Sequence, residues 1–274
     1  MINIFKPLFY EPARHIYKLI FQDKYRRYCI LESKLGKRPR YTECKVIVND
    51  WELHLPDSAS FLSAYKEIFL REIYAFKSPQ EAPNILDLGA NIGLSVLFFK
   101  RLYPQSEITA FEADPALFEI LKKNIYGNGF NDVKLLNKAI WHKNEIINFS
   151  VEGADGGRIA QKKDGNLVQV QAIDLNEYLT EHHVDFLKMD IEGAEGLVLT
   201  ACEKSLSKIR WIFVEYHSRV DEKQYLDQII RILSQQGFRI HIHSEFYTDS
   251  PFISRKIRSN FDLQLNIFAW RNDN

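Results

Sequence analysis

Several features that mark specialised protein classes are scarce in this sequence. Its 274 residues include only three cysteines, which are scattered, odd in number and in no metal-binding spacing. We therefore expect reduced thiols in a cytoplasmic protein and no disulfide scaffold. Lysine and arginine total 36, as do aspartate and glutamate, so no global field favours nucleic acid or an anionic membrane.

Long apolar runs are also missing. No stretch reaches the length of a membrane span, and Pro7 and Pro12 interrupt the N-terminus, which lacks the continuous apolar core of a signal peptide. Internal repeats and low-complexity tracts are absent from the sequence. With 46% hydrophobic residues the chain can bury a full core. We expect one large domain, or a domain with an extension, and no integral membrane segment.

The first 80 residues are predicted to form an extension of helices and one hairpin. Residues 13–35 carry apolar side chains at helical spacing, which indicates one or two amphipathic helices. Basic residues gather between positions 24 and 40. They form either a solvated helix face, which is the simpler interpretation, or a rim for an acidic partner or a glycan.

A hairpin and a further helix are expected next. Residues 44–55 alternate between apolar and polar around a turn at Asn49 and Asp50. Residues 61–76 show the spacing of a helix. The stretch from Ser78 to Pro83 is typical of a linker. We therefore divide the chain into an extension, residues 1–80, and a core domain, residues 81–274.

The core domain opens with a strand, a glycine-rich turn and a helix between Asn84 and Leu97. This arrangement directs free backbone N–H groups toward a ligand, as in nucleotide-binding folds. Glycine permits the sharp turn and the close approach of a ligand, but the spacing is not the dinucleotide pattern G-x-G-x-x-G. The expected cofactor-binding residues here are Asp87, Gly89, Ala90, Asn91 and Gly93.

An acidic residue follows at the tip of the second predicted strand, residues 107–111. Glu112 lies 23 residues after Gly89, close to the separation at which an acid hydrogen-bonds a ribose diol in such folds. The alternative is an acid that only favours the N-terminus of the next helix. Residues 133–140 are expected to form a third strand. Further cofactor contacts are expected at Ala113, Asn137 and Ala139, the last two at the edge of the adenine ring.

A hairpin arm is predicted from residues 145–151 and 167–172. The segment that joins them, residues 152–158, is polar and rich in glycine. It is either a lid over the acceptor side or an exposed hairpin tip.

A second informative stretch runs from Val184 to Glu195, where a strand enters Asp190 and a turn at Gly193 leads into a helix. The segment Phe186-Leu187-Lys188-Met189-Asp190-Ile191-Glu192-Gly193-Ala194-Glu195 resembles the signature of the FkbM family of S-adenosylmethionine (SAM) dependent methyltransferases. The stretches 87–93, 111–115 and 212–217 resemble that family's other landmarks in the same order. The resemblance covers residues 84–217 well and the tail only loosely.

This resemblance implies a fold and a reaction. The fold is α/β, a doubly wound, Rossmann-like seven-stranded sheet of the class I methyltransferases, with the N-terminal extension added. Residues 238–243 and 263–270 resemble the antiparallel pair that closes such sheets. The family implies a SAM-dependent O-methyltransferase that acts on a hydroxyl of a sugar, a glycan or a related natural product.

The expected catalytic residues lie at the carboxyl ends of two strands, where ligands bind in open α/β sheets. Glu215 and His217 are two residues apart on a strand and so share one face. We predict that His217 is the base, that Glu215 orients it, and that Asp190 meets the SAM methionine end or the acceptor. A purely structural histidine is the alternative. Glu192 and Glu195 are further candidates at these strand ends, but either could instead only cap the helix that starts near Ala194, and for Glu195 the cap is the preferred interpretation.

Some alternatives stay open. A divalent metal on Asp190, Glu215 and His217 is possible, but we predict none. A Rossmann-type nucleotide-sugar oxidoreductase and a non-catalytic SAM-binding module are the competing functions. Expected partners are a small-molecule or glycan acceptor and no nucleic acid, and the sequence does not define the oligomeric state.

Overall fold

The computed structural model describes residues 5–150, 158–159, 167–220, 222–244, 250, 252–253 and 261–272. The segment predicted as a lid lies outside these residues, except for Arg158 at its end. Among the helices described, no apolar stretch is long enough to cross a lipid bilayer.

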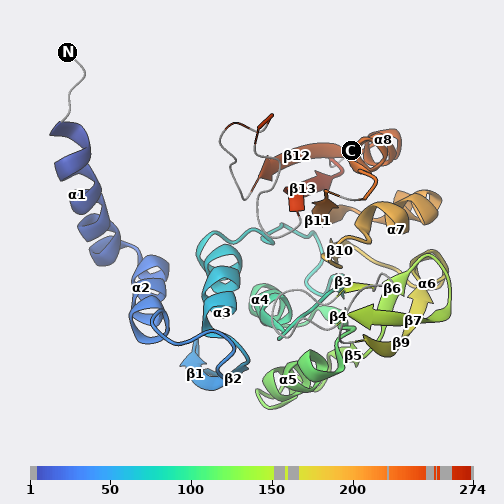
Figure 1. Cartoon of the computed structure of the whole chain (residues 1–274). Coiled ribbons are helices and arrows are strands. Elements are labelled where there is room, and N and C mark those ends of the chain that lie inside the picture. The colour runs from blue at the N-terminus through green and yellow to red at the C-terminus, as the bar shows by residue number, and fades with distance from the viewer. Residues whose placement is uncertain are drawn as a thin grey trace.

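The extension begins with two helices, α1 (Phe5–Phe21) and α2 (Asp23–Leu35). The first starts eight residues before the predicted helical segment, and Pro12 lies inside it. The second ends at Leu35, as the predicted segment 13–35 does, and the N–H of its C-cap residue Gly36 donates to the Glu32 carbonyl over 2.8 Å. Figure 1 shows α1 projecting away from the body of the molecule, beyond α2.

The predicted hairpin is present, as strands β1 (Cys44–Val48) and β2 (Trp51–Leu55). Asn49 and Asp50 turn the chain with φ values of 51° and 67°, the paired left-handed conformation of a type I′ turn. Helix α3 (Ser58–Tyr65) follows, capped by Asp57, whose carboxylate accepts from the Ser60 N–H.

Helix α3 is shorter than the helix predicted over residues 61–76. A π-helical turn, η1 (Lys66–Leu70), ends it where the Arg71 N–H donates to the Lys66 carbonyl. Glu72 then takes a left-handed conformation with φ of 55°, which is incompatible with continuing the helix to residue 76.

The core domain is built on a seven-stranded sheet in the order β12-β13-β11-β10-β3-β4-β5. Strands β11, β10, β3, β4 and β5 run parallel, and β13 is antiparallel to both of its neighbours. The order reverses between β3 and β10, so their carboxyl ends border the expected ligand crevice. The bounds are β3 (Asn84–Leu88), β4 (Glu107–Phe111), β5 (Lys134–Leu136), β10 (Phe186–Met189), β11 (Trp211–Arg219), β12 (Arg239–Ser244) and β13 (Phe261–Trp270).

Two layers of helices bury the faces of this sheet. Helices α4 (Leu94–Leu102) and α5 (Pro115–Tyr126) share one hydrophobic cluster with α2, α3 and the hairpin. Helices α6 (Leu175–Glu181), α7 (Glu195–Ala201) and α8 (Leu226–Gln235) pack into the cluster on the other face, together with the 3₁₀ segment η2 (Glu203–Lys208). The extension from α2 onward therefore packs into the same core as the sheet, and the boundary near residue 80 remains a prediction.

The predicted third strand, residues 133–140, is wrong as one continuous strand. It divides into β5 and β6 (Ala139–Trp141), and β6 belongs to a separate four-stranded sheet in the order β6-β9-β7-β8. Asn137 lies at the break and donates to the carbonyls of Glu112 and Ala113 over 2.8 and 3.2 Å. These bonds hold the chain at the end of β4 while it leaves the main sheet.

The predicted hairpin arm forms the rest of the small sheet. Strands β7 (Glu145–Ser150) and β9 (Leu167–Asp174) pair antiparallel, and β8 (Arg158–Ile159) pairs with β7. Figure 1 shows this sheet beside the carboxyl end of the main sheet.

Candidate active site

The glycine-rich turn after β3 is shaped by backbone crowding. Gly89 has φ of 84°, and a Cβ there would lie 1.8 Å from the Asp190 carbonyl oxygen. Gly93 has φ of 93° and caps α4, where a Cβ would lie 2.8 Å from Leu121. Only glycine tolerates both the conformation and the contact. The turn therefore brings the ends of β3 and β10 together beside the N-terminus of α4.

A buried ion pair lies below this turn. The Asp87 carboxylate is fully buried, accepts a hydrogen bond from the Ser95 hydroxyl, and lies 3.2 Å from the Lys188 ammonium. Lys188 also donates to the Gly89 carbonyl over 2.7 Å and lies 3.6 Å from Asp190. Burial disfavours the charged ammonium, but the carboxylates of Asp87 and Asp190 outweigh it and raise the pKa of Lys188. Lys188 thus links the glycine turn to both acids.

Glu112 lies at the tip of β4, facing the turn. Its carboxylate accepts from the backbone N–H groups of Asn91 and Asp114, each over 2.8 Å, and its side chain is buried. Burial raises the pKa of Glu112 to about 7, against the lowering effect of these two bonds. The carboxylate is therefore held in position before any ligand arrives.

A pocket opens at the carboxyl ends of β3, β4 and β10. Of the ten predicted cofactor-binding residues, six line it. The other four, Asp87, Ala90, Gly93 and Asn137, support its wall from behind. The lining residues are Gly89, Asn91, Phe111, Glu112, Ala113, Leu117, Lys138, Ala139, Ile140, Phe149, Asp190, Ile191 and Glu192.

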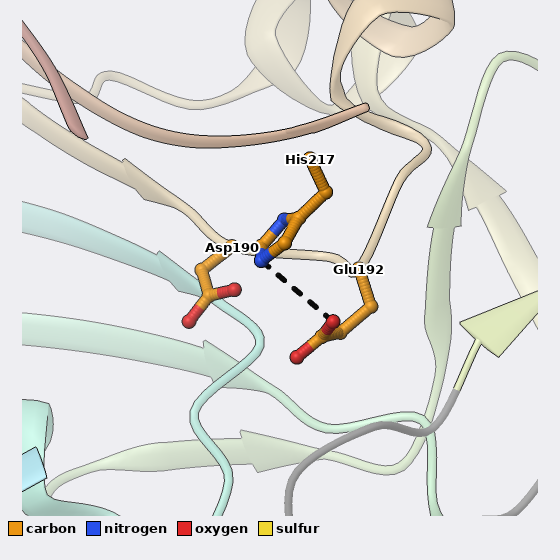
Figure 2. Close-up of side chains that lie close together, drawn as sticks. All are labelled: Asp190, Glu192 and His217. Carbon is orange, nitrogen blue, oxygen red and sulfur yellow. Dashed lines mark ion pairs between the residues drawn. The ribbon is translucent and has the colours of Figure 1, made fainter. Parts of the chain in front are cut away.

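His217 lies at the side of this pocket, buried near the end of β11, and four carboxylates surround it or lie close by. Its Nδ1 atom lies 3.2 Å from Glu195, and its Nε2 atom lies 3.7 Å from both Glu192 and Glu215. Figure 2 shows the imidazole directed toward Glu192, with Asp190 alongside. The predicted orienting role of Glu215 differs from this geometry, because Glu195 holds Nδ1 while Glu215 accepts from Gln264.

Glu195 does more than cap a helix. Its fully buried carboxylate accepts from the N–H groups of Ile191 and Gly193 over 3.1 and 3.0 Å, and so closes the turn after β10. The same carboxylate fixes the His217 ring. Glu192, in the middle of that turn, has φ of 58°, a conformation that non-glycine residues rarely adopt. The closed turn keeps Glu192 between the pocket and His217.

The pKa values of His217, Glu192 and Glu215 in this cluster are raised above their ordinary values. Burial alone would lower the pKa of His217, but the carboxylates of Glu192, Glu195 and Glu215 outweigh it and hold the pKa well above its ordinary value. Burial, with neighbouring negative charge, raises the pKa of Glu192 to about 8 and of Glu215 to about 7. The cluster therefore holds more protons at neutral pH than the same groups would in water.

Asp190, Glu192 and His217 also have the spacing of cation ligands. Each offers one ligand atom, and these atoms lie within 4.8 Å of one another (Figure 2). Two oxygens and an imidazole nitrogen are donors that suit Mn²⁺ or Mg²⁺. The trio differs from the set weighed on sequence grounds, because Glu192 replaces Glu215.

The family model described as the methyltransferase FkbM domain matches residues 87–240, which include the glycine turn, Glu112, the turn after β10 and His217. The chain belongs to the FkbM methyltransferase family. This result confirms the resemblance found in the sequence motifs, and the seven-stranded sheet confirms the predicted fold.

Relatives of this FkbM domain include methyltransferases from fungi and bacteria. The chain is 29% identical to methyltransferase sdnD of Sordaria araneosa, over 64% of this chain and 81% of that protein. It is 28% identical to the 2-O-methyltransferase NoeI of Sinorhizobium fredii (strain NBRC 101917 / NGR234), over 54% of this chain and 67% of that protein. A solved structure, methyltransferase FkbM from Methylobacillus flagellatus KT, aligns with 79% of this chain and 56% of that chain, with a TM-score of 0.48 and 14% identity.

Two residues of the FkbM site have a larger structural part than the sequence suggested. Lys188 was not predicted to act at the site, although a lysine two residues before Asp190 on one strand shares its face. Glu192 had two interpretations, a group of the site or a helix cap, because its side-chain direction depends on a left-handed backbone conformation that no local pattern predicts.

Proposed function

We propose that this protein is a SAM-dependent O-methyltransferase whose acceptor is a hydroxyl of a sugar, a glycan or a related natural product. The observation that carries the proposal is that Glu112 and Glu192 line the same pocket. Glu112 lies where a ribose diol is expected, and Glu192 lies beside a histidine that can exchange protons. The named activity of the relative NoeI, a 2-O-methyltransferase, supports the reaction class.

Glu112 supplies the ribose contact. An ionised carboxylate accepts two O–H donors at once, and its two oxygens are held by separate backbone N–H groups. The backbone between Gly89 and Gly93 supplies N–H groups and close approach for the rest of the cofactor. When bound, SAM supplies the methyl group of its sulfonium.

The acceptor proton leaves through the cluster around His217. A sugar hydroxyl is a weak nucleophile, so a base within reach of its proton accelerates transfer. Glu192 lines the pocket and lies 3.7 Å from His217 Nε2, which connects the pocket to the buried imidazole. Asp190, at the end of β10, orients the acceptor or the methionine end of SAM. Orientation in line with the methyl group can itself supply roughly 7–11 kcal/mol of the barrier.

A calorimetric titration with SAM, S-adenosylhomocysteine and NAD(P) tests this proposal against its competitors. We expect binding of SAM and S-adenosylhomocysteine and none of NAD(P). Binding of NAD(P) alone would favour an oxidoreductase. Tight SAM binding without methyl transfer to any member of a broad hydroxyl screen would favour a non-catalytic binding module. Mass spectrometry of co-purified small molecules, together with a glycan screen, would identify the acceptor.

A further inference from the structure

The positive charge of this chain is concentrated at its N-terminus. Residues 1–40 contain ten lysines and arginines against three acidic residues, an excess of seven positive charges. The remaining residues contain 26 basic and 33 acidic residues, an excess of seven negative charges. The zero net charge of the whole chain therefore conceals a strongly basic extension attached to an acidic body.

Helix α1 carries an exposed apolar face within this basic segment. Ile16, Tyr17, Ile20 and Phe21 are 55%, 58%, 59% and 68% exposed. They form two pairs at a spacing of four residues, so they lie on adjoining strips of one side of the helix. The rings of Tyr17 and Phe21 lie 4.9 Å apart. The last two turns of α1 thus present aliphatic and aromatic groups together.

Basic residues border this apolar face. Arg14 and Lys18 are also four residues apart and occupy the adjoining strip of the same helix. Lys24, Arg26 and Arg27 continue the positive charge into α2. Figure 1 shows α1 extending away from the body of the molecule.

We propose that α1 binds the surface of an anionic lipid bilayer. A helix with an apolar face, aromatic side chains and flanking basic residues lies in the plane of the interface. Ile16, Ile20 and Phe21 would enter the headgroup boundary, and Arg14 and Lys18 would contact the anionic headgroups. The helix has 17 residues, interrupted by Pro12, and it lies on the bilayer without spanning it.

Charge favours a bilayer over the α1 helix of a second copy. Packing two copies of α1 together would bring two N-terminal segments close to one another, and each segment, residues 1–40, has seven excess positive charges. Such like-charge contact is unfavourable, and the central parts of protein interfaces are depleted in charged residues. An anionic bilayer offers the opposite charge beside an apolar phase, which matches both features of α1.

Vesicle co-sedimentation of the full chain tests this proposal. We expect the wild-type protein to bind phosphatidylcholine vesicles that contain one quarter phosphatidylglycerol, and to bind pure phosphatidylcholine vesicles more weakly. The Ile16→Ser/Ile20→Ser variant should bind about 100-fold more weakly, about tenfold for each isoleucine, because its apolar side-chain carbons no longer leave water. The Arg14→Glu/Lys18→Glu variant should lose the preference for phosphatidylglycerol, and 0.5 M salt should weaken wild-type binding.

A matched control separates this effect from general surface hydrophobicity. Ile47 and Ile146 are 74% and 69% exposed on strands β1 and β7, and the Ile47→Ser/Ile146→Ser variant should bind like the wild type. SAM affinity should be unchanged in all variants, which shows that the fold is intact. Equal loss in the control variant would overturn the proposal, as would absence of wild-type binding. Light scattering that shows a dimer abolished by Ile16→Ser/Ile20→Ser, without vesicle binding, would instead assign the face to a second copy.

Discussion

Substitution of Glu112 by glutamine tests whether the buried carboxylate lowers the stability of the fold while it contributes to cofactor binding. Burial raises the pKa of Glu112 from its ordinary value near 4.5 to about 7. Below pH 4.5 the carboxyl is protonated in both the folded and the unfolded chain, so folding costs nothing extra there. As pH rises from 4.5 through 7, the unfolded chain ionises first, and the stability contributed by this group is lost.

The size of this loss follows from the two pKa values. One pKa unit corresponds to 1.36 kcal/mol, so the wild-type protein should lose roughly 3 kcal/mol between pH 4.5 and 8 through Glu112. Glu112→Gln cannot ionise and should not show this loss. The glutamine variant loses one hydrogen bond relative to the carboxylate, because its NH₂ group would face the N–H of Asn91 or Asp114. The informative quantity is therefore the difference in pH dependence between the two proteins.

Urea unfolding at several pH values, without cofactor, measures this difference. Glu107→Gln is the matched control, because Glu107 begins the same strand but is exposed, and its pH dependence should follow the wild type. The same Glu112→Gln variant should bind SAM more weakly by about 1–3 kcal/mol, the usual loss of hydrogen bonds to a charged group. Parallel stability curves for the wild type and Glu112→Gln would refute the electrostatic reasoning, and unchanged SAM affinity would refute the ribose assignment.

Further predictions concern the pocket and the glycine turn. His217→Ala should lower kcat roughly 10²–10⁴-fold without changing SAM affinity, and a near-normal kcat in this variant would make the histidine structural. Because the surrounding carboxylates raise the pKa of His217, the wild-type rate should increase with pH above the ordinary histidine pKa of 6.5. EDTA treatment should leave the rate unchanged if His217 acts as a base, whereas loss of activity that Mn²⁺ restores would make Asp190, Glu192 and His217 ligands. Gly89→Ala should destabilise the protein strongly in thermal unfolding, because its Cβ would overlap the Asp190 carbonyl; an unchanged Tm would contradict the close approach. Hydrogen exchange in residues 155–158 should be rapid and should slow with SAM and acceptor if this loop is a lid.

Much of the fold could be predicted because its signals are local. The turn at Asn49 and Asp50 needs residues that tolerate positive φ. Asp114 caps α5 and Pro115 is its first residue, so two adjacent residues predict where this helix begins. Short apolar runs before Gly89 and Asp190 marked the central strands. The cofactor side of the site followed from the same motifs, since the order of the strands places their carboxyl ends together.

Other features depend on residues far apart in the sequence. The amide of Asn137 ends β5 by bonding the carbonyls that follow β4, about 25 residues earlier, so the strand pattern alone could not predict the break. The partner of His217 Nδ1 is Glu195, on another element, whereas Glu215, which is closer in the sequence, accepts from Gln264.

The family, the central strands β3, β4 and β10, and the residues of the glycine turn could be predicted from the sequence, because each is encoded in contiguous residues or fixed spacing. The pairing of the charged side chains at the site, in contrast, depends on how the chain packs. Lys188 pairs with Asp87 and Asp190, and His217 lies among Glu192, Glu195 and Glu215. Burial and distance set these interactions, and both are properties of the packed chain that no local sequence pattern specifies.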